Sequence, residues 1–497
     1  MRKFKRFAAL GLAAAMAATS LAACGTKDSS SAAGGDTKTE AAKEDKTEAA
    51  KEEDTKAADA ETEAASSGSL RDEIAAKTYD GEGKTLNIYV WNDEFISRVA
   101  DHFPGYQKVD ATTGKIGNVD VVFTKVDNQD NKYQDNLDEV LQNNGEGQEN
   151  ASADDKIDIF LVEADYANKY IDTNCTMNVK DLGITDDDLS KQYQYTKDAV
   201  TDSNGNLKGV SWQGCPGVLI YRRDIAKEVL GTDDPDEVQK SVADWDKFLD
   251  TAKKMAEKGY TMTSSANDAY RVFSNNVSSK WVEDGKLNID PNIQKWVEVS
   301  KEMVDGKMTG THDLWSDDWS KGFFKEGKVF CYFGPAWLID FSMHSDEDGS
   351  VGKDGGWAAA KGPQGFFWGG TWMCAANGTD NPELVKDLML CLTTDDDTMQ
   401  SIVEKDNDFV NNSVVMEKMA ADTSYGDKIL GGQNAIPMFC EGIKTVSLAN
   451  ISAYDQGCNE EFQKAMKAYF EGNSTYDEAL KAFKDAVHTK YPAVSVD

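Results

Sequence analysis

Residues 84–91 read KTLNIYVW and residues 157–162 read IDIFLV, and these two stretches decide the fold. In the first, small apolar residues alternate with polar or aromatic ones, which is typical of a β-strand. The second is almost continuously apolar, as expected of a parallel strand that is buried on both faces. A third strand-like run, VDVVFTKV, lies between them at 119–126. The sequence therefore predicts three strands of one sheet in this region.

Helical patterns separate the three predicted strands. An apolar stripe at 95–99 follows Asn92, a residue type that caps helices, and a second stripe runs from 133 to 141. The order strand, helix, strand, helix, strand predicts right-handed crossovers and a doubly wound α/β lobe. Ligands bind at the carboxyl ends of the strands in such a lobe. Residues 91–93 and 163–166 should therefore share one rim.

The pattern changes in the next part of the chain. Residues 209–221 form an apolar strand that is interrupted by Gly214, Pro216 and Gly217. Breakers inside an apolar strand mark a bend or a crossing between lobes. Residues 224–310 then carry mainly amphipathic helical patterns, which indicates a second lobe with more helix than the first.

Composition limits the classes of partner. The chain has 497 residues, 40% of them hydrophobic, and a formal net charge of −34. That length predicts two or three domains at about 100–200 residues each. So acidic a body would repel nucleic acid and anionic lipid, so neither is expected as a partner. Arginine is rare, which argues weakly against an anionic ligand.

The N-terminus predicts export. MRKFKR is basic, FAALGLAAAMAA is apolar but too short to span a bilayer, and LAACG at 21–25 resembles a bacterial lipobox. We expect a lipoprotein signal peptide at 1–23, cleaved before Cys24, and a diacylglycerol on the Cys24 thiol, with palmitate as an expected acyl group. Residues 24–69 lack aromatic residues and are expected to form a disordered linker. The folded body is expected at 70–497.

Eight cysteines occur, and seven remain after Cys24. No C-x-x-C motif and no histidine at metal-ligand spacing accompany them. Buried free thiols are favoured over a disulfide framework or a zinc site, although one or two disulfide pairs stay open. No metal and no cofactor are expected.

Ordered landmarks connect the chain to a known family. They are LNIYVW at 86–91, IDIFLVEAD at 157–165, GNLKGVSWQGCPGVLIYRRDIAKE at 205–228, FKEGKVFCYFGPAW at 324–337, GPQG at 362–365, WGGTW at 368–372, NPE at 381–383, IPMF at 436–439 and TYDEAL at 475–480. In this order they resemble the sugar-binding family (family 1) of extracellular solute-binding proteins of bacterial ABC importers. The resemblance covers about 84–492.

The resemblance implies a two-lobed, type II periplasmic-binding-protein-like α/β fold with a hinge between the lobes. By analogy, lobe 1 would comprise about 84–213 and 360–392. Lobe 2 would comprise about 214–359 and 393–497. Such proteins close on a ligand in the cleft between the lobes and present the closed shape to a transporter.

A sugar offers an apolar face and a rim of hydroxyls, so its site needs flat aromatic side chains and short polar groups. The candidates for stacking are Trp91, Tyr166, Trp212, Trp337 and Trp372, with Trp368, Tyr270 and Phe439 behind them. The candidates for hydroxyl binding are Asn92, Asp93, Glu163, Asp165 and Gln213. Trp245, Trp281 and Trp296 lie in helical patterns and are expected to pack in the core, whereas the roles of Trp315 and Trp319 stay open.

The resulting hypothesis is a lipid-anchored protein on the outer face of the cell membrane, expected in a Gram-positive bacterium. It would act as a monomer that captures a carbohydrate, most simply an oligosaccharide, and delivers it to the permease subunits of an ABC transporter. An enzyme is not expected, because the chain has no G-x-S-x-G, H-E-x-x-H or Walker motif.

Two alternatives stay open. One is a binding protein for a polyamine or peptide, and the other is a surface glycoside hydrolase. Binding that weakens with salt would identify a cationic ligand and exclude a neutral glycan.

Overall fold

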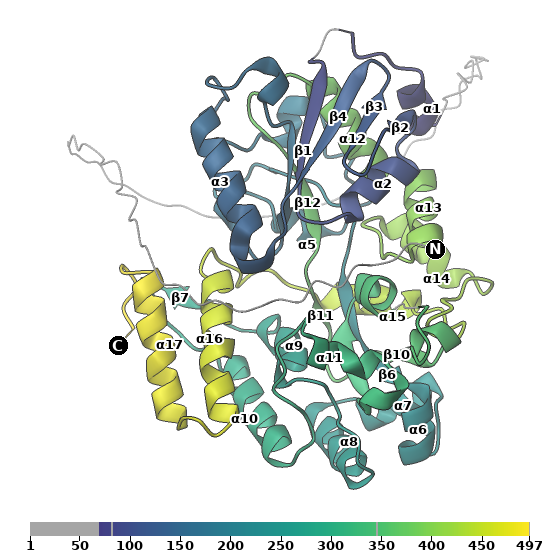
Figure 1. Cartoon of the computed structure of the whole chain (residues 1–497), viewed down its shortest axis with the longest axis vertical. Helices are drawn as coiled ribbons and strands as arrows, with labels where there is room; N and C mark the ends of the chain where they lie inside the picture. The colour runs from purple at the N-terminus through teal and green to yellow at the C-terminus, as the bar shows by residue number, and fades with distance from the viewer. Residues whose placement is uncertain (1–68, 81–82, 344–345, 497) are drawn as a thin grey trace, which may run out of the picture. The chain divides into compact units, whose positions relative to one another are not determined.

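The computed structural model describes residues 69–80, 83–343 and 346–496. The predicted signal peptide, Cys24 and the linker as far as residue 68 lie outside the described residues. The described body contains two main sheets, each covered by helices (Figure 1), and a small two-stranded sheet of β7 (Val282–Glu283) and β8 (Lys286–Leu287). The predicted α/β class is confirmed.

The first sheet has the strand order β12-β5-β1-β4-β3-β2. Its centre is formed by β1 (Thr85–Val90), β4 (Val119–Lys125) and β5 (Ile159–Glu163), the three strands that the sequence predicts. β1 pairs in parallel with both neighbours. β2 (Tyr106–Lys108), β3 (Thr113–Ile116) and β12 (Thr371–Ala375) add antiparallel edges.

Helices connect and cover this first sheet. α2 (Glu94–His102) and α3 (Lys132–Asn144) form the predicted crossovers, and α12 (Pro382–Thr394) packs beside α2. The N-cap of α2 is Asp93, one residue later than expected, and the Asn92 side chain accepts a hydrogen bond from the Glu94 N–H at 3.0 Å. Asn92 therefore still satisfies one of the free N–H groups of the first helical turn.

The second sheet is antiparallel and centres on β6 (Pro216–Arg222), all seven of whose residues are buried. Its other strands are β9 (Cys331–Gly334), β10 (Trp357–Ala360) and β11 (Phe366–Phe367). The helices around it include α8 (Trp245–Glu257), α9 (Tyr270–Ser274), α10 (Pro291–Asp305), α15 (Ile436–Gly442), α16 (Asp455–Phe470) and α17 (Tyr476–Lys490). Trp245, Trp281 and Trp296 are buried in this core, as the helical patterns predict.

Three segments of the chain pass between the two sheets. Residues 211–215 lead into β6, residues 368–370 lead from β11 to β12, and residues 407–412 follow α13 (Asp396–Asp406). They hold one another through backbone hydrogen bonds, including Gly214 N–H to the Phe409 carbonyl at 2.8 Å and Trp368 N–H to the Cys215 carbonyl at 3.1 Å. The interrupted strand therefore marks a crossing, as the sequence predicts. We call these three segments the crossing.

Two further features bear on the sequence predictions. The seven cysteines in the described ranges are all free thiols, and five of them are buried. Within the same ranges, none of the helices has both the length and the apolar character needed to cross a membrane.

The second lobe contains a buried carboxyl group that should make stability depend on pH. Asp268 is 2% exposed and accepts hydrogen bonds from Trp319 Nε1 at 2.6 Å and from the Ser265 N–H at 2.7 Å. Burial raises the pKa of Asp268 to about 7, against about 3.9 in an unfolded chain. Across that window the folded chain holds a proton that the unfolded chain has released. The free energy of unfolding should therefore fall as pH rises from about 4 to 7.

Asp268→Asn removes this titration, so its free energy of unfolding is expected to fall less steeply between pH 5 and pH 7 than that of the wild type. Urea denaturation at both pH values measures the slope. Asp101→Asn, at an exposed position of α2, is the matched control and should keep the wild-type slope. An unchanged slope in the Asp268 variant would contradict the assignment.

Candidate functional site

A cavity of about 460 Å³ lies between the two lobes. The first lobe lines it with the residues that follow β1 and β5, and the second lobe lines it with α9, α16 and the ends of loops. We call it the aromatic cavity. Its lining residues are Trp91, Asn92, Glu94, Asn128, Asn131, Glu163, Asp165, Tyr166, Gln213, Arg271, Trp315, Trp337, Trp368, Gly369, Gly370, Thr371, Gln456 and Glu460.

The rim predicted from the sheet topology is part of this cavity. β1 and β5 are parallel neighbours, so Trp91 and Glu163 stand at adjacent carboxyl ends. Trp91 is held edge-on against Tyr133 and Tyr166, with ring centroids 5.3 and 6.4 Å apart. These ring contacts fix the position of Trp91 on the side of the cavity that the first lobe forms.

Three tryptophans from different segments meet on the opposite side. Trp315 stacks on Trp337 with ring centroids 6.0 Å apart and planes 28° apart, and both contact Trp368. Trp337 Nε1 donates to the Trp368 carbonyl at 3.3 Å. Trp315 is 54% exposed and has φ +69°, a left-handed conformation that a bulky residue adopts only under strain. Such strain is found where a side chain must be presented for function.

An ion pair crosses from one lobe to the other beside these rings. The Arg271 guanidinium on α9 donates to both carboxylate oxygens of Asp165, with Nη1 2.5 Å from Oδ1. Arg271 also lies over the Trp368 ring, 6.0 Å from its centroid. Bidentate pairs fix geometry as well as charge. This pair therefore joins the loop after β5 directly to α9.

Glu163 lies beside this pair. Its side chain accepts a hydrogen bond from the Asp165 N–H at 2.8 Å. Burial, together with the negative charge of Asp165, raises the pKa of Glu163 above its ordinary value, and Arg271 opposes this rise. A Cβ on Gly369 would lie 3.2 Å from Glu163 Oε1, and φ at Gly369 is +68°. Glycine at this position therefore lets the crossing approach Glu163 closely.

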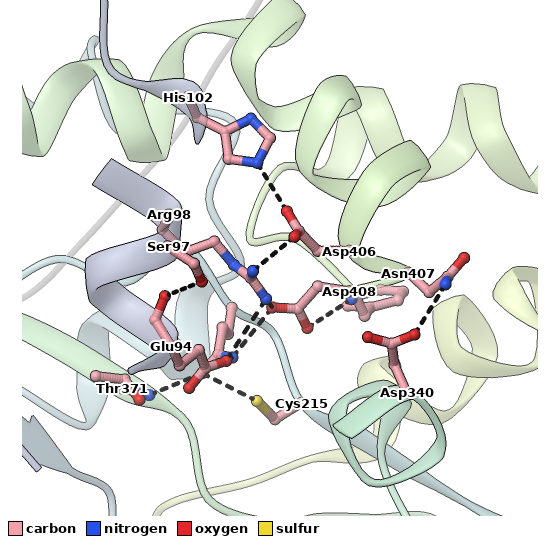
Figure 2. Close-up of polar contacts among 12 residues, drawn as sticks. Glu94, Ser97, Arg98, His102, Cys215, Asp340, Thr371, Asp406, Asn407 and Asp408 are labelled. Atoms are coloured by element: carbon pink, nitrogen blue, oxygen red, sulfur yellow. Dashed lines mark hydrogen bonds and ion pairs between the residues drawn. The ribbon is translucent and has the colours of Figure 1, made fainter. Parts of the chain in front are cut away.

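A polar network around Arg98 reaches the cavity through Glu94, which belongs to its lining (Figure 2). Arg98 on α2 is 4% exposed and faces three carboxylates, with Nη1 2.9 Å from Asp406 and Nη2 3.5 Å from Asp408 and 3.7 Å from Glu94. Asp406 also meets His102 Nε2 at 2.7 Å. Burial raises the pKa of Glu94 and of Asp408, while Arg98 opposes the rise in both.

Gln213 connects this network to the cavity. Its Nε2 donates to Glu94 Oε1 at 2.5 Å and to Asp408 Oδ2 at 3.1 Å, and its Oε1 accepts from the Thr371 N–H at 3.2 Å. One side chain of the crossing thereby contacts α2, the start of β12 and the segment 407–412. That Gln213 binds a ligand hydroxyl stays a prediction. Both ends of its amide already make hydrogen bonds within the protein, so a ligand would have to compete with them.

The structure brings together eight of the predicted side chains and leaves five elsewhere. Those that line the cavity are Trp91, Asn92, Glu163, Asp165, Tyr166, Gln213, Trp337 and Trp368. Trp212, Trp372, Tyr270, Phe439 and Asp93 do not line it. This placement corrects their predicted position in the cleft.

Packing explains why these five lie elsewhere. Trp212 is fully buried against Phe95, and Trp372 is buried with its Nε1 on the Thr196 carbonyl. Tyr270 and Phe439 are buried against Trp296 and Phe409, respectively. Asp93 is largely exposed and pairs with Lys125. Trp372 lies in β12, where alternation turns it to the face opposite to that of its neighbour Thr371, which lines the cavity. Tyr270 and Phe439 lie on α9 and α15 and pack into the core.

Several lining residues were missed. Glu94 follows the predicted Asn92-Asp93 pair and could have been found by extending the rim into the first helical turn. Arg271 follows the predicted Tyr270, but no local pattern marks it as a residue of the cleft. Trp315, whose role the sequence left open, lines the cavity, whereas Trp319 is buried. Asn128, Asn131, Gln456 and Glu460 carry no sequence signal that links them to the cleft.

No metal site is indicated in the part of the chain that the structure describes, where histidine, cysteine and carboxyl groups do not gather in threes at ligand spacing. The aromatic cavity instead presents flat apolar rings beside polar groups from both lobes. Such an arrangement can hold a polar organic molecule between the lobes.

Comparisons with known proteins agree with this geometry. A family model described as bacterial extracellular solute-binding protein matches residues 108–423. A solved extracellular solute-binding protein of family 1 is 18% identical, with a TM-score of 0.63, covering 81% of this chain and 99% of that chain. No curated protein sequence matches the chain as a relative.

Two other similar structures are described with sugars. An ABC-transporter-associated binding protein of B. animalis subsp. lactis Bl-04, in complex with β-1,6-galactobiose, is 16% identical, with a TM-score of 0.63 and coverage of 84% and 100%. The galacto-N-biose-/lacto-N-biose I-binding protein of Bifidobacterium longum, in complex with lacto-N-biose, is 14% identical, with a TM-score of 0.61 and the same coverage. At these identities the likeness shows a shared fold.

The Arg98 network predicts a large effect on stability. Arg98→Met leaves three neighbouring carboxyl groups without their buried cation, so the free energy of unfolding is expected to fall by about 3–5 kcal/mol. Lys125→Met breaks the exposed pair with Asp93 and serves as the control, with an expected loss of about 0–1 kcal/mol. Urea denaturation compares the two. Equal losses in both variants would show that the buried network contributes no more than a surface pair.

Proposed function

Because this chain belongs to the bacterial extracellular solute-binding proteins, we propose that it captures a carbohydrate in the aromatic cavity and delivers it to the permease of an ABC transporter. The observation that carries the proposal is that Trp315, Trp337 and Trp368 contact one another in the cavity lining, which also contains carboxyl groups from the opposite lobe. Rings of this kind stack on the apolar face of a sugar, and carboxylates accept its hydroxyls.

Unpartnered polar atoms in the lining support a polar ligand. The Tyr166 hydroxyl and Asn128 Oδ1 are buried without a hydrogen-bond partner among the described residues. Leaving a buried polar atom unpaired costs about 1–3 kcal/mol. Ligand hydroxyls, which both donate and accept, would pair with these atoms if the two side chains turned to expose them to the cavity. The sugars named for the two bifidobacterial proteins of similar fold agree with this class of ligand.

The cellular part of the proposal rests on the N-terminal sequence. A signal peptide at 1–23 and a lipid on Cys24 would anchor the protein outside the membrane, and 24–69 would tether the body near the permease. The lobe limits implied by the family, about 84–213 with 360–392 and about 214–359 with 393–497, belong to the same proposal. So do the monomeric state and the absence of catalysis.

A second candidate function is the binding of a polyamine. It is favoured by the charges in the lining, which contains four carboxyl side chains, Glu94, Glu163, Asp165 and Glu460, and one cationic side chain, Arg271. Carboxylates beside aromatic rings also suit an ammonium group. The two ligands differ in one measurable respect, because attraction between charges is screened by salt and stacking on a neutral sugar is not.

Isothermal titration calorimetry with neutral oligosaccharides and with spermidine, at low and high salt, tests the two candidates. The proposed function predicts saturable binding of at least one glycan with an affinity that is insensitive to salt and with no turnover on long incubation. Salt-sensitive binding of spermidine, without binding of any glycan, would replace the carbohydrate with a polyamine.

Trp337→Ala is expected to weaken glycan binding by about 1–3 kcal/mol, because it removes an aromatic anchor from the cavity. Phe341→Ala is the matched control, since Phe341 is 58% exposed and lies outside the cavity lining. Calorimetry on both variants, after their folding has been checked by circular dichroism, measures the difference. Unchanged affinity in folded Trp337→Ala would exclude stacking on this ring.

A further inference from the structure

A second cavity, of about 210 Å³, lies on the other side of the Asp165–Arg271 ion pair. Asp165 and Arg271 line both cavities, so the ion pair stands between them. The second cavity is polar and contains one aromatic side chain, Phe367, in its lining. Its other lining residues are Ala164, Ser274, Asn275, Asn276, Val277, Thr445, Ser447, Asn450, Ile451, Asp455 and Asn459. We call it the asparagine chamber.

Two of the four asparagines present N–H donors. Asn275 Oδ1 accepts from the Phe367 N–H at 2.7 Å, and Asn459 Oδ1 accepts from Tyr270 at 2.6 Å and from Trp281 Nε1 at 2.9 Å. These bonds fix which end of each amide is oxygen. The Nδ2 groups of both residues have no hydrogen-bond partner within the described ranges.

The other two asparagines present acceptors. Asn276 Nδ2 donates to the Val272 and Gly365 carbonyls, both at 2.8 Å, and Asn450 Nδ2 donates to the Val277 carbonyl at 2.7 Å. Their Oδ1 atoms have no partner among the residues that the structure describes. Each of the four amides is therefore held in place by one end and offers the other end, which is preorganisation for a ligand.

The combination of donors and acceptors selects the chemistry of the occupant. A cation would use acceptors alone and an anion would use donors alone, whereas a hydroxyl group both donates and accepts. Ser274, Ser447 and Thr445 add hydroxyls of the same kind. Asp165 is neutralised by Arg271, which leaves Asp455 as the remaining formal charge in the lining. A hydroxyl-rich, uncharged group satisfies this set best.

We propose that the asparagine chamber is a binding site for a further sugar unit of the glycan whose first units occupy the aromatic cavity. The inference rests on the proposed function and adds to it a ligand of at least three sugar units. The glycan would then pass beside the ion pair, which lines both cavities, with stacking on one side of it and amide hydrogen bonds on the other.

The test is calorimetry on the full chain with two named series, maltose to maltotetraose and β-1,6-galactobiose to β-1,6-galactotetraose. In the wild type, affinity should rise from the disaccharide to the longer members of the series that binds. Ser447→Tyr places a bulky ring at an exposed loop position of the chamber. This variant should lose the gain with length and keep the affinity for the disaccharide.

Asn275→Asp tests the amides separately, since it keeps the oxygen that accepts from Phe367 and removes the free donor. It should weaken binding of the longer glycan about three- to tenfold, the effect of one hydrogen bond. Asn473→Asp, with the same charge change at an exposed turn, should have no effect.

The outcomes separate the two proposals. Glycan binding without a gain from length, or with the same gain in Ser447→Tyr, would overturn the chamber and leave the proposed function intact. Failure of every member of both series to bind the wild type would overturn the chamber together with carbohydrate binding for these linkages. Loss of the gain in Ser447→Tyr, with disaccharide binding unchanged, supports the chamber.

Discussion

The Arg98 guanidinium lies buried among Glu94, Asp406 and Asp408, and the join between the lobes depends on this contact. Arg98 belongs to α2 in the first lobe, whereas Asp406 and Asp408 flank the start of a crossing segment. Without the cation, the buried Asp408 and the partly buried Glu94 and Asp406 would repel one another and would lose hydration without compensation. The single arginine holds the helix and the crossing together beside the cavity.

A few side chains connect the Arg98 network to the lining of the candidate site. Gln213, in the crossing, hydrogen-bonds to Glu94 of the network and to Thr371 at the start of β12. Gly369, also in the crossing, allows a close approach to Glu163. Asp165 and Arg271 join the lobes a second time. A ligand held between Trp337 and the rim of the first sheet would therefore touch both lobes and the segments about which they can move. Hinge closure in two-lobed proteins uses few residues of this kind.

The sequence predicts more of the fold than of the candidate site. The three central strands and their helices follow from local periodicity, because β1 and β5 are buried in patterns that the sequence displays directly. Of the site, the sequence could predict the rim at Trp91 and Glu163, since the topology of a parallel sheet fixes which ends meet. It could not separate Trp337, which faces the cavity, from Trp372, which faces the core, because both follow similar glycine-containing segments. Arg271 and Glu460 approach the rim only through the packing of α9 and α16, for which no local pattern exists.

The central claim is that the space between the lobes holds a sugar against the tryptophans. A crystal structure of the chain with the tightest-binding neutral oligosaccharide tests this most directly. We expect a sugar ring stacked on Trp337, with hydroxyl groups within hydrogen-bond distance of Glu163. A glycan bound at another surface, with the aromatic cavity free of it, would contradict the account.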